Sequence, residues 1–231
     1  MAKFYGSAVK TGKIGGSVFR IRYGETIESQ YQPIVANPST PAQVESRAKL
    51  KLLSQLSAIL APAIAMPRVG GASTRNRFTA ANYGAVTFEN NEANINVTDI
   101  QLTKSVVGFT DLTATRGDNA IVASVSSGQN VNHVVFVLIS KGNDEKLRYA
   151  DSAVVSTPTS QGRYSHSFYD VGGVCYVLAY GMRDNTDAAR ATFGNLISPA
   201  AEDVAKIITS RVLLETDVTL TETKGVTVPV A

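Results

Sequence analysis

From about residue 95 onward the sequence consists of short β-prone segments at regular spacing, and this pattern limits the possible folds more than any other feature. The segments are separated by turn clusters rich in Gly, Asn, Asp and Ser. Six or seven short strands over about 100 residues are typical of an antiparallel β-sandwich of immunoglobulin-like or fibronectin-like size. The predicted strands cover residues 95–102, 120–125, 131–139, 147–155, 164–169 and 174–180.

Length and composition place this sandwich within a chain of three regions. At 231 residues, with 44% hydrophobic and 18% charged residues, the chain is predicted to be globular rather than disordered. We expect residues 1–90 to form a basic arm, a hairpin and an amphipathic helix. Residues 91–198 are the predicted sandwich, and residues 199–231 an extended C-terminal tail. The predicted fold class is therefore mainly β with one long helix.

Charge is divided unevenly between these regions. The first 77 residues contain eleven Lys or Arg and three Asp or Glu, whereas the other 154 contain eleven basic and sixteen acidic residues. A basic, Gly-rich N-terminal region on a near-neutral body indicates contact with an acidic surface or a nucleic acid. The residues expected to make that contact are Lys10, Lys13, Arg20, Arg22, Arg47, Lys49, Lys51, Arg68, Arg75 and Arg77.

The predicted hairpin lies near the N-terminus. Segment 17–23 alternates apolar residues with Arg20 and Arg22, which predicts a strand with one apolar, aromatic face and one arginine face. Residues 26–31 follow a Gly-containing turn and are predicted to form the second strand.

The amphipathic helix has the clearest local signal. Thr40 as N-cap, Pro41 at the first helical position and Gln43 at the third predict a capping box and a helix of about twenty residues. An apolar stripe along this helix requires a partner surface, either within the same chain or on another subunit. The stripe consists of Val44, Ala48, Leu52, Leu56 and Leu60, widened by Leu53 and Ile59.

Residues 67–84 have the composition of a basic loop in which arginines are mixed with Phe78 and Tyr83. This mixture suits phosphate contacts with base stacking, and it suits a solvated protein interface equally well.

The C-terminal tail is β-prone in two pieces between residues 216 and 230. Such a tail either adds an edge strand to its own sheet or pairs with the sheet edge of another chain.

No constellation of residues points to catalysis, a metal or a cofactor, so a non-enzymatic role without a small-molecule substrate is expected. Cys175 lies in an apolar run and is interpreted as a buried hydrophobic residue. His133 and His166 lack metal-ligand spacing. The glycines of segment 6–14 do not have the phosphate-loop spacing, and the Arg-Gly-Asp tripeptide at 116–118 is interpreted as turn chemistry.

The sequence contains neither a signal peptide pattern nor an apolar run long enough to span a bilayer. We therefore expect a soluble protein made in a bacterial cytoplasm.

Two motifs resemble those of a family of uncharacterised proteins from Bacteroidota and their phages. They are Gly-Lys-Ile-Gly at 12–15 and Asn-Pro-Ser-Thr-Pro-Ala-Gln at 37–43, the latter followed by Arg47. The family shares a Gly-Lys-x-Gly start and an Asn-Pro-x-Thr-x-Ala-Gln helix opening before a β-sandwich, although this chain lacks a Trp in its first strand region. The family carries no known active-site residues. The resemblance implies a phage virion component.

Three hypotheses follow. The leading one is a structural protein of a bacteriophage virion, associated with the capsid, head surface or tail. It would assemble with itself and other virion proteins through the basic N-terminal region and the C-terminal tail. The second is a nucleic-acid-binding protein that uses the same basic residues with nearby aromatic ones. The third is an enzyme or carbohydrate-binding module on the sandwich. The aromatic residues of the second hypothesis are Tyr5, Phe19, Tyr23 and Phe78.

Overall fold

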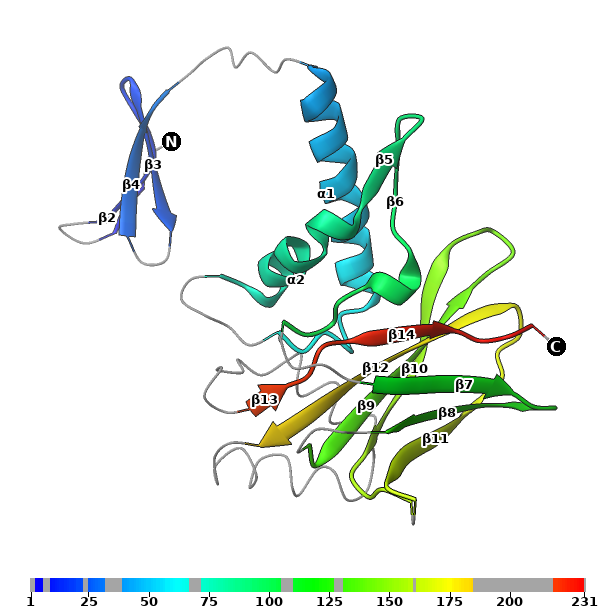
Figure 1. The fold of residues 1–231 in the computed structure, drawn as a ribbon. Helices are drawn as coiled ribbons and strands as arrows, with labels where there is room; N and C mark the ends of the chain where they lie inside the picture. Colours follow the sequence, from blue (N-terminus) through cyan, green and yellow to red (C-terminus); the bar gives the residue numbers. More distant parts are fainter. Residues whose placement is uncertain are drawn as a thin grey trace. The chain divides into compact units, whose positions relative to one another are not determined.

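The computed structural model of the chain is mainly β, with several sheets and few helices (Figure 1). The chain divides into two compact units, Met1–Gln43 and Val44–Ala231. Residues 44–90, predicted to belong to the N-terminal region, are therefore grouped with the β-rich body. The structure describes residues 3–5, 9–22, 25–31, 39–66, 72–104, 110–126, 131–159, 161–184 and 218–230.

The first unit is a four-stranded antiparallel sheet. Its strands are β1 (Lys3–Tyr5), β2 (Val9–Ile14), β3 (Ser17–Arg22) and β4 (Glu25–Gln30), in that spatial order. The predicted hairpin is confirmed as β3 and β4, with Arg20 opposite Ile27. β2 and β3 are joined by a turn containing Gly15, whose φ of 60° glycine adopts without steric cost.

α1 (Pro41–Ile59) starts in the first unit and belongs to the second unit from Val44 onward. Most of the predicted apolar stripe packs on the core, with Leu52 and Ile59 partly buried against it. Leu53, Leu56 and Leu60 are buried, whereas Val44 and Leu50 are 37% and 48% exposed. A four-residue step advances about 40° around a helix of 3.6 residues per turn. The predicted stripe takes four such steps, which explains why Val44 at its start is exposed while Leu56 and Leu60 are buried.

A second helix lies within the segment predicted as a loop. α2 (Thr74–Asn82) begins after Ser73, whose side-chain oxygen accepts a hydrogen bond from the Asn76 amide at 3.2 Å. This N-cap explains why the basic stretch is helical there. The capping box predicted for α1 is not formed, because Oε1 of Gln43 is buried without a hydrogen-bond partner. Short elements follow: η1 (Tyr83–Ala85), β5 (Thr87–Glu89), β6 (Glu92–Asn94) and η2 (Val97–Asp99).

Two larger sheets form the β-rich body. One has the order β11-β8-β7, and the other has β9 between β10 and β12, with β13 and β14 on the far side of β12. The strands are β7 (Thr110–Arg116), β8 (Ala120–Ser126), β9 (His133–Lys141), β10 (Leu147–Val155), β11 (Arg163–Tyr169), β12 (Val174–Asp184), β13 (Val218–Leu220) and β14 (Lys224–Thr227).

One predicted strand is wrong. Residues 95–102 contain η2 instead, because the side chain of Asn96 accepts a hydrogen bond from the Thr98 amide and closes a helical turn. Ile100 and Leu102 are apolar there because they are fully buried beneath the helices, not because they alternate along a strand. β7 is a strand that the sequence pattern did not predict.

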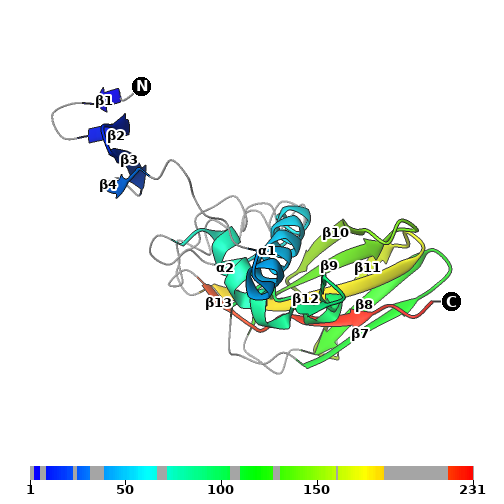
Figure 2. The same cartoon turned by 90° about the horizontal axis from the view of Figure 1, so that it is seen from above.

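The β10-β9-β12 sheet is buried on both faces. Along β9, Val135, Val137 and Ile139 belong to a cluster shared with α1, α2 and η2, whereas Phe136 and Leu138 belong to a cluster shared with the β11-β8-β7 sheet. Because neighbouring residues of a strand point to opposite faces, this alternation produces three layers, helices, sheet and sheet. The α1 and α2 helices lie side by side over the first cluster (Figures 1 and 2).

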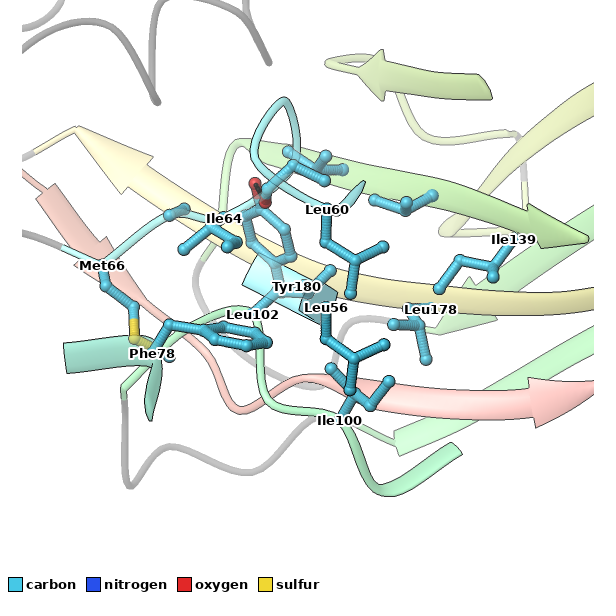
Figure 3. Packing of buried hydrophobic residues seen from close by; sticks show 14 of the residues in the cluster. Leu56, Leu60, Ile64, Met66, Phe78, Ile100, Leu102, Ile139, Leu178 and Tyr180 are labelled. Carbon is cyan, nitrogen blue, oxygen red and sulfur yellow. Dashed lines mark hydrogen bonds between the residues drawn. The ribbon is translucent and has the colours of Figure 1, made fainter. Parts of the chain in front are cut away.

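Large apolar side chains pack between the helical layer and the sheet. Leu56 of α1 and Leu60, the residue after its end, meet Leu178 and Tyr180 of β12 in the first cluster (Figure 3). The Tyr180 hydroxyl donates a hydrogen bond to the Ala63 carbonyl at 3.2 Å, so this fully buried phenol is satisfied. The apolar side of α1 therefore packs on the body of its own chain, one of the two possibilities that the sequence left open.

The C-terminal strands also pair within the chain. Val226 of β14 lies opposite Val177, and Leu220 of β13 lies opposite Met182, so both strands extend β12 (Figure 1). Between them Thr223 accepts hydrogen bonds from the amides of Leu102 and Thr103 at 2.9 and 3.1 Å. Of the two alternatives for the tail, the edge strand in its own sheet is the one formed. Residues 199–217 lie outside the described residues.

Candidate functional site

The first unit carries two of the predicted basic residues on one face. Lys13 lies opposite Val18 on β3, and Arg20 lies opposite Ile27 on β4. Residues paired across an antiparallel sheet share a face, and so do alternate residues of one strand. Lys13 and Arg20 therefore project from one side, which we name the basic face. There the Lys13 ammonium lies 3.5 Å from the centre of the Tyr31 ring, a close cation–π contact.

The opposite side of this sheet is largely uncharged. Ile14, Phe19 and Ile21 are on it, together with Thr26 and other polar residues of β4, and we name it the apolar face. Ile14 and Ile21 are 36% and 47% exposed. Among the residues of the first unit whose burial is described, 12–21, 26–31 and 39–43, none is buried. The sheet therefore has no core of its own within those residues.

A second basic surface lies on the helices of the second unit. Arg47 and Lys51 are exposed one turn apart on α1. Arg75 of α2 hydrogen-bonds to Ser54, three residues beyond Lys51, so Arg75 lies beside the same side of α1. We name Arg47, Lys51 and Arg75 the helical basic surface. Arg77, two residues after Arg75 in α2, is half-buried.

Lys49 is positioned differently. Its ammonium is 2.8 Å from the Glu45 carboxylate and 5.6 Å from the centre of the Tyr83 ring, and its side chain is largely covered. The positive charge of Lys49 is therefore paired within the helical layer. Arg68 lies outside the described residues, and for Lys10 and Arg22 only the backbone in β2 and β3 is described. The predicted basic residues thus fall into two groups on separate units.

The aromatic residues of the nucleic-acid hypothesis, where they are described, do not lie beside the basic residues in positions that would allow base stacking. Phe78 is fully buried in the first cluster, so it cannot stack on a base. Phe19 is on the apolar face, opposite to Arg20. The side chain of Tyr5 and the whole of Tyr23 lie outside the described residues. The interpretation of Phe78 as a stacking residue is therefore wrong, because α2 turns it inward.

A groove of about 910 Å³, which the sequence did not indicate, runs between α1 and the sheet. Its apolar walls include Leu52, Ile59 and Tyr176, and an ion pair between Lys141 and Glu145 lies at its rim. The hydrogen bond to Glu145 raises the pKa of Lys141 above its usual value. Lys141 therefore stays protonated at neutral pH, which suits charge pairing and not proton abstraction. The groove has the size of a ligand pocket.

Arg116, of the Arg-Gly-Asp tripeptide, is largely buried at the end of β7. Its guanidinium is 2.9 Å from the Asp170 carboxylate and donates hydrogen bonds to the Gly173 carbonyl and to Cys175 Sγ, at 2.8 and 3.3 Å. Only 8% of its side chain is exposed, so Arg116 is not presented to a receptor. Burial raises the pKa of the Cys175 thiol, and the sulfur is fully covered. Cys175 therefore behaves as the buried residue that the sequence indicated.

The two histidines are separate from the groove. The His133 ring lies 3.0 Å from the Ser156 hydroxyl at the start of β9. His166 packs edge-on against Phe168, and burial lowers its pKa. Across the described ranges no group of three or more His, Cys, Asp or Glu is placed to hold a metal ion.

Comparison with known proteins adds no relative. No protein-family model and no curated protein sequence matches the chain. In the part of the chain that the structure describes, no helix is long and apolar enough to cross a membrane.

Proposed function

We propose that this chain is a non-enzymatic structural protein of a bacteriophage virion, associated with the capsid, head surface or tail, and that it assembles through its N-terminal unit. The observation that carries the proposal is the N-terminal sheet. It exposes Ile21 and Ile27 by 47% and 40%, and none of its residues with described burial is buried. A single-layer sheet without a core is poorly stable in water, so this unit requires a partner surface.

In this proposal the β-rich body of the second unit acts as a rigid spacer. Its strand orders, β11-β8-β7 in one sheet and β10-β9-β12 with β13 and β14 beside β12 in the other, support a sandwich of the immunoglobulin or fibronectin kind. We infer that class for it. The two clusters of the second unit give this spacer its own stability, and its C-terminal strands are engaged in its own sheet. The N-terminal unit therefore becomes the main assembly contact.

The motifs at 12–15 and 37–43 supply the virion part of the proposal through their resemblance to phage-encoded proteins. Residues 12–14 of the first motif are in β2 of the exposed sheet, and residues 41–43 of the second begin α1. The proposal places the protein in the virion with itself and other virion proteins as partners.

The test is quantitative mass spectrometry of gradient-purified, nuclease-treated particles. We expect the full chain at a fixed ratio to the major shell protein, and a chain lacking residues 1–36 to be lost from particles while its soluble level is unchanged. That soluble level is the control for folding. Absence of the full chain from particles would contradict the virion role. Incorporation of the truncated chain at the same ratio would contradict the N-terminal contact.

Nucleic-acid binding is the second candidate, and the helical basic surface favours it. Lys51 and Arg75 come from different helices to one side of α1. If they contact phosphates, log affinity for DNA falls linearly with log salt, and Lys51→Ala reduces that slope by about one. An affinity that does not respond to salt would contradict this candidate and leave protein partners.

A further inference from the structure

We infer that the groove between α1 and the sheet binds an extended peptide segment of another protein, which pairs with the free edge of β6 and places an acidic group beside Lys146. This site lies on the second unit and goes beyond the proposed function, which uses the N-terminal unit. Four segments line the groove: α1, residues 92–97, the turn between β9 and β10, and the start of β12.

Residues 92–97 present the edge of a strand to the groove, not one of its faces. Every residue from Glu92 to Asn96 contributes to the lining. Neighbouring residues of a strand point to opposite faces, so a face would contribute only alternate residues. β5, which is described in full, pairs with the other edge of β6 and contributes nothing to the lining (Figure 1). The groove therefore runs along the edge of β6 that β5 leaves free.

The turn of the β5–β6 hairpin determines which backbone groups lie on that edge. Asn90 and Asn91 have φ angles of 51° and 63°, as in a two-residue type I′ turn. The flanking residues Glu89 and Glu92 then exchange backbone hydrogen bonds, so the N–H and C=O of Ala93 point away from β5. Within the described ranges neither of these two groups has a backbone hydrogen-bond partner. β6 therefore offers the donor and the acceptor that an added strand requires.

The interior of the groove determines the side chains of such a strand. Leu52, Ile59 and Tyr176 form apolar walls and are only partly buried, so apolar surface remains to be covered. The volume of about 910 Å³ is near the upper end of the range for ligand pockets, which suits a short peptide better than a single side chain. A peptide with apolar residues at alternate positions buries these walls with one face while its backbone pairs with Ala93.

Charge at the rim selects an acidic group at one end of the peptide. Residues 141–148 carry three basic and two acidic side chains. The Lys141–Glu145 ion pair uses one charge of each sign. Both carboxylate oxygens of Asp144 accept hydrogen bonds from Arg148, at 3.0 and 2.8 Å. Lys146 is left with a contact of 3.9 Å to the same carboxylate, and its side chain is 78% exposed. Its ammonium is therefore the basic group of this rim that an acidic partner satisfies best.

Glu92 is the remaining charged residue of the lining, and it lies on β6. Like charges repel, so the acidic group of the peptide belongs at the end of the groove beside Lys146 and away from Glu92. The occupant is thus defined by three features: an extended backbone, alternate apolar side chains and one acidic end.

The experiment begins with random linear heptapeptides displayed on phage and selected on the immobilised full chain. We expect the enriched peptides to share apolar residues at alternate positions and Asp or Glu at one end. The most enriched peptide is then synthesised with a fluorescein label and titrated with the full chain, and fluorescence anisotropy measures its dissociation constant.

Two alanines of α1 provide a matched pair of protein variants. Ala58 and Ala42 are both exposed, but only Ala58 lines the groove. We expect Ala58→Trp to narrow the groove and weaken peptide binding at least tenfold, whereas Ala42→Trp leaves it within about twofold. Lys146→Glu is expected to weaken binding at least threefold. Equal effects of the two tryptophan variants would overturn the inference.

A chemical change in the peptide tests the pairing with β6 and leaves the wild-type protein intact. Alternate amides of a strand point to the same side, so N-methylation of each peptide nitrogen in turn should weaken binding at every second position only. Ala93→Pro removes the outward N–H without removing a bond to β5, and we expect it to weaken binding at least threefold. No enriched peptide, uniform tolerance of N-methylation, or wild-type affinity in Ala93→Pro would each overturn the inference. None of these results depends on whether the chain enters virions.

Discussion

At the scale of single residues, Thr223 shows how one hydroxyl joins two distant parts of the chain. Its oxygen accepts hydrogen bonds from the amides of Leu102 and Thr103, more than 100 residues earlier in sequence, and it is 2% exposed. Thr223→Val keeps the shape but leaves two buried amide groups without an acceptor. We expect a loss of about 1–3 kcal/mol in the free energy of unfolding, measured by urea denaturation. The exposed Thr227→Val is the control and should stay within about 0.5 kcal/mol.

His166 provides a pH prediction at the same scale. Burial lowers its pKa in the folded state, so the unfolded chain binds a proton more readily at mildly acidic pH. Stability is therefore greatest above the ordinary histidine pKa of about 6.5 and falls as the pH drops through it. We expect His166→Gln to flatten the stability curve just below about pH 6.5. An unchanged slope in thermal melts across that range would show that His166 does not contribute.

At the scale of elements, α1 illustrates what sequence patterns can and cannot determine. Its helical state follows from local signals, Pro41 at the first position and a long run without Gly. Most of its buried side follows too, because Leu53, Leu56 and Leu60 belong to the predicted apolar stripe and are buried. The length of the contact does not, because Val44, in the same stripe, is 37% exposed.

Two substitutions in α1, one at a buried and one at an exposed leucine, test this packing. Leu53→Ala removes a fully buried side chain and should cost about 2–5 kcal/mol. Leu50→Ala, three residues earlier and 48% exposed, should change stability by less than about 0.5 kcal/mol. Chemical denaturation of both variants measures the difference. Similar losses in the two variants would mean that the exposed side of α1 is also packed.

At the scale of the whole molecule, the two units should differ in independence. The second unit contains both buried clusters, whereas the described residues of the first contribute to neither. A chain lacking residues 1–36 should therefore unfold cooperatively with a midpoint within about 2 °C of the full chain, by scanning calorimetry. A large drop in the midpoint would show that the N-terminal sheet stabilises the body.

The candidate surfaces were only partly predictable. The alternation of Arg20 with Phe19 and Ile21 was enough to place them on opposite faces of a strand, since that depends only on the two-residue period. The groove was not predictable, because Leu52, Tyr176 and Lys141 come from three segments whose proximity depends on the packing of α1 on the sheet. The inward position of Phe78 was missed for the same reason.

The sequence by itself determined the local features of this protein: a β-rich chain, the helix from Pro41, the hairpin of β3 and β4, the buried Cys175 and the basic N-terminal region. These depend on side-chain period, turn residues and charge within a few positions of one another. Tertiary structure alone decided that β9 is buried on both faces, that the helices form a third layer, and that residues 218–227 extend β12. Those outcomes depend on contacts between residues up to about 120 positions apart, whose pairing is set by competition among many apolar segments for one core.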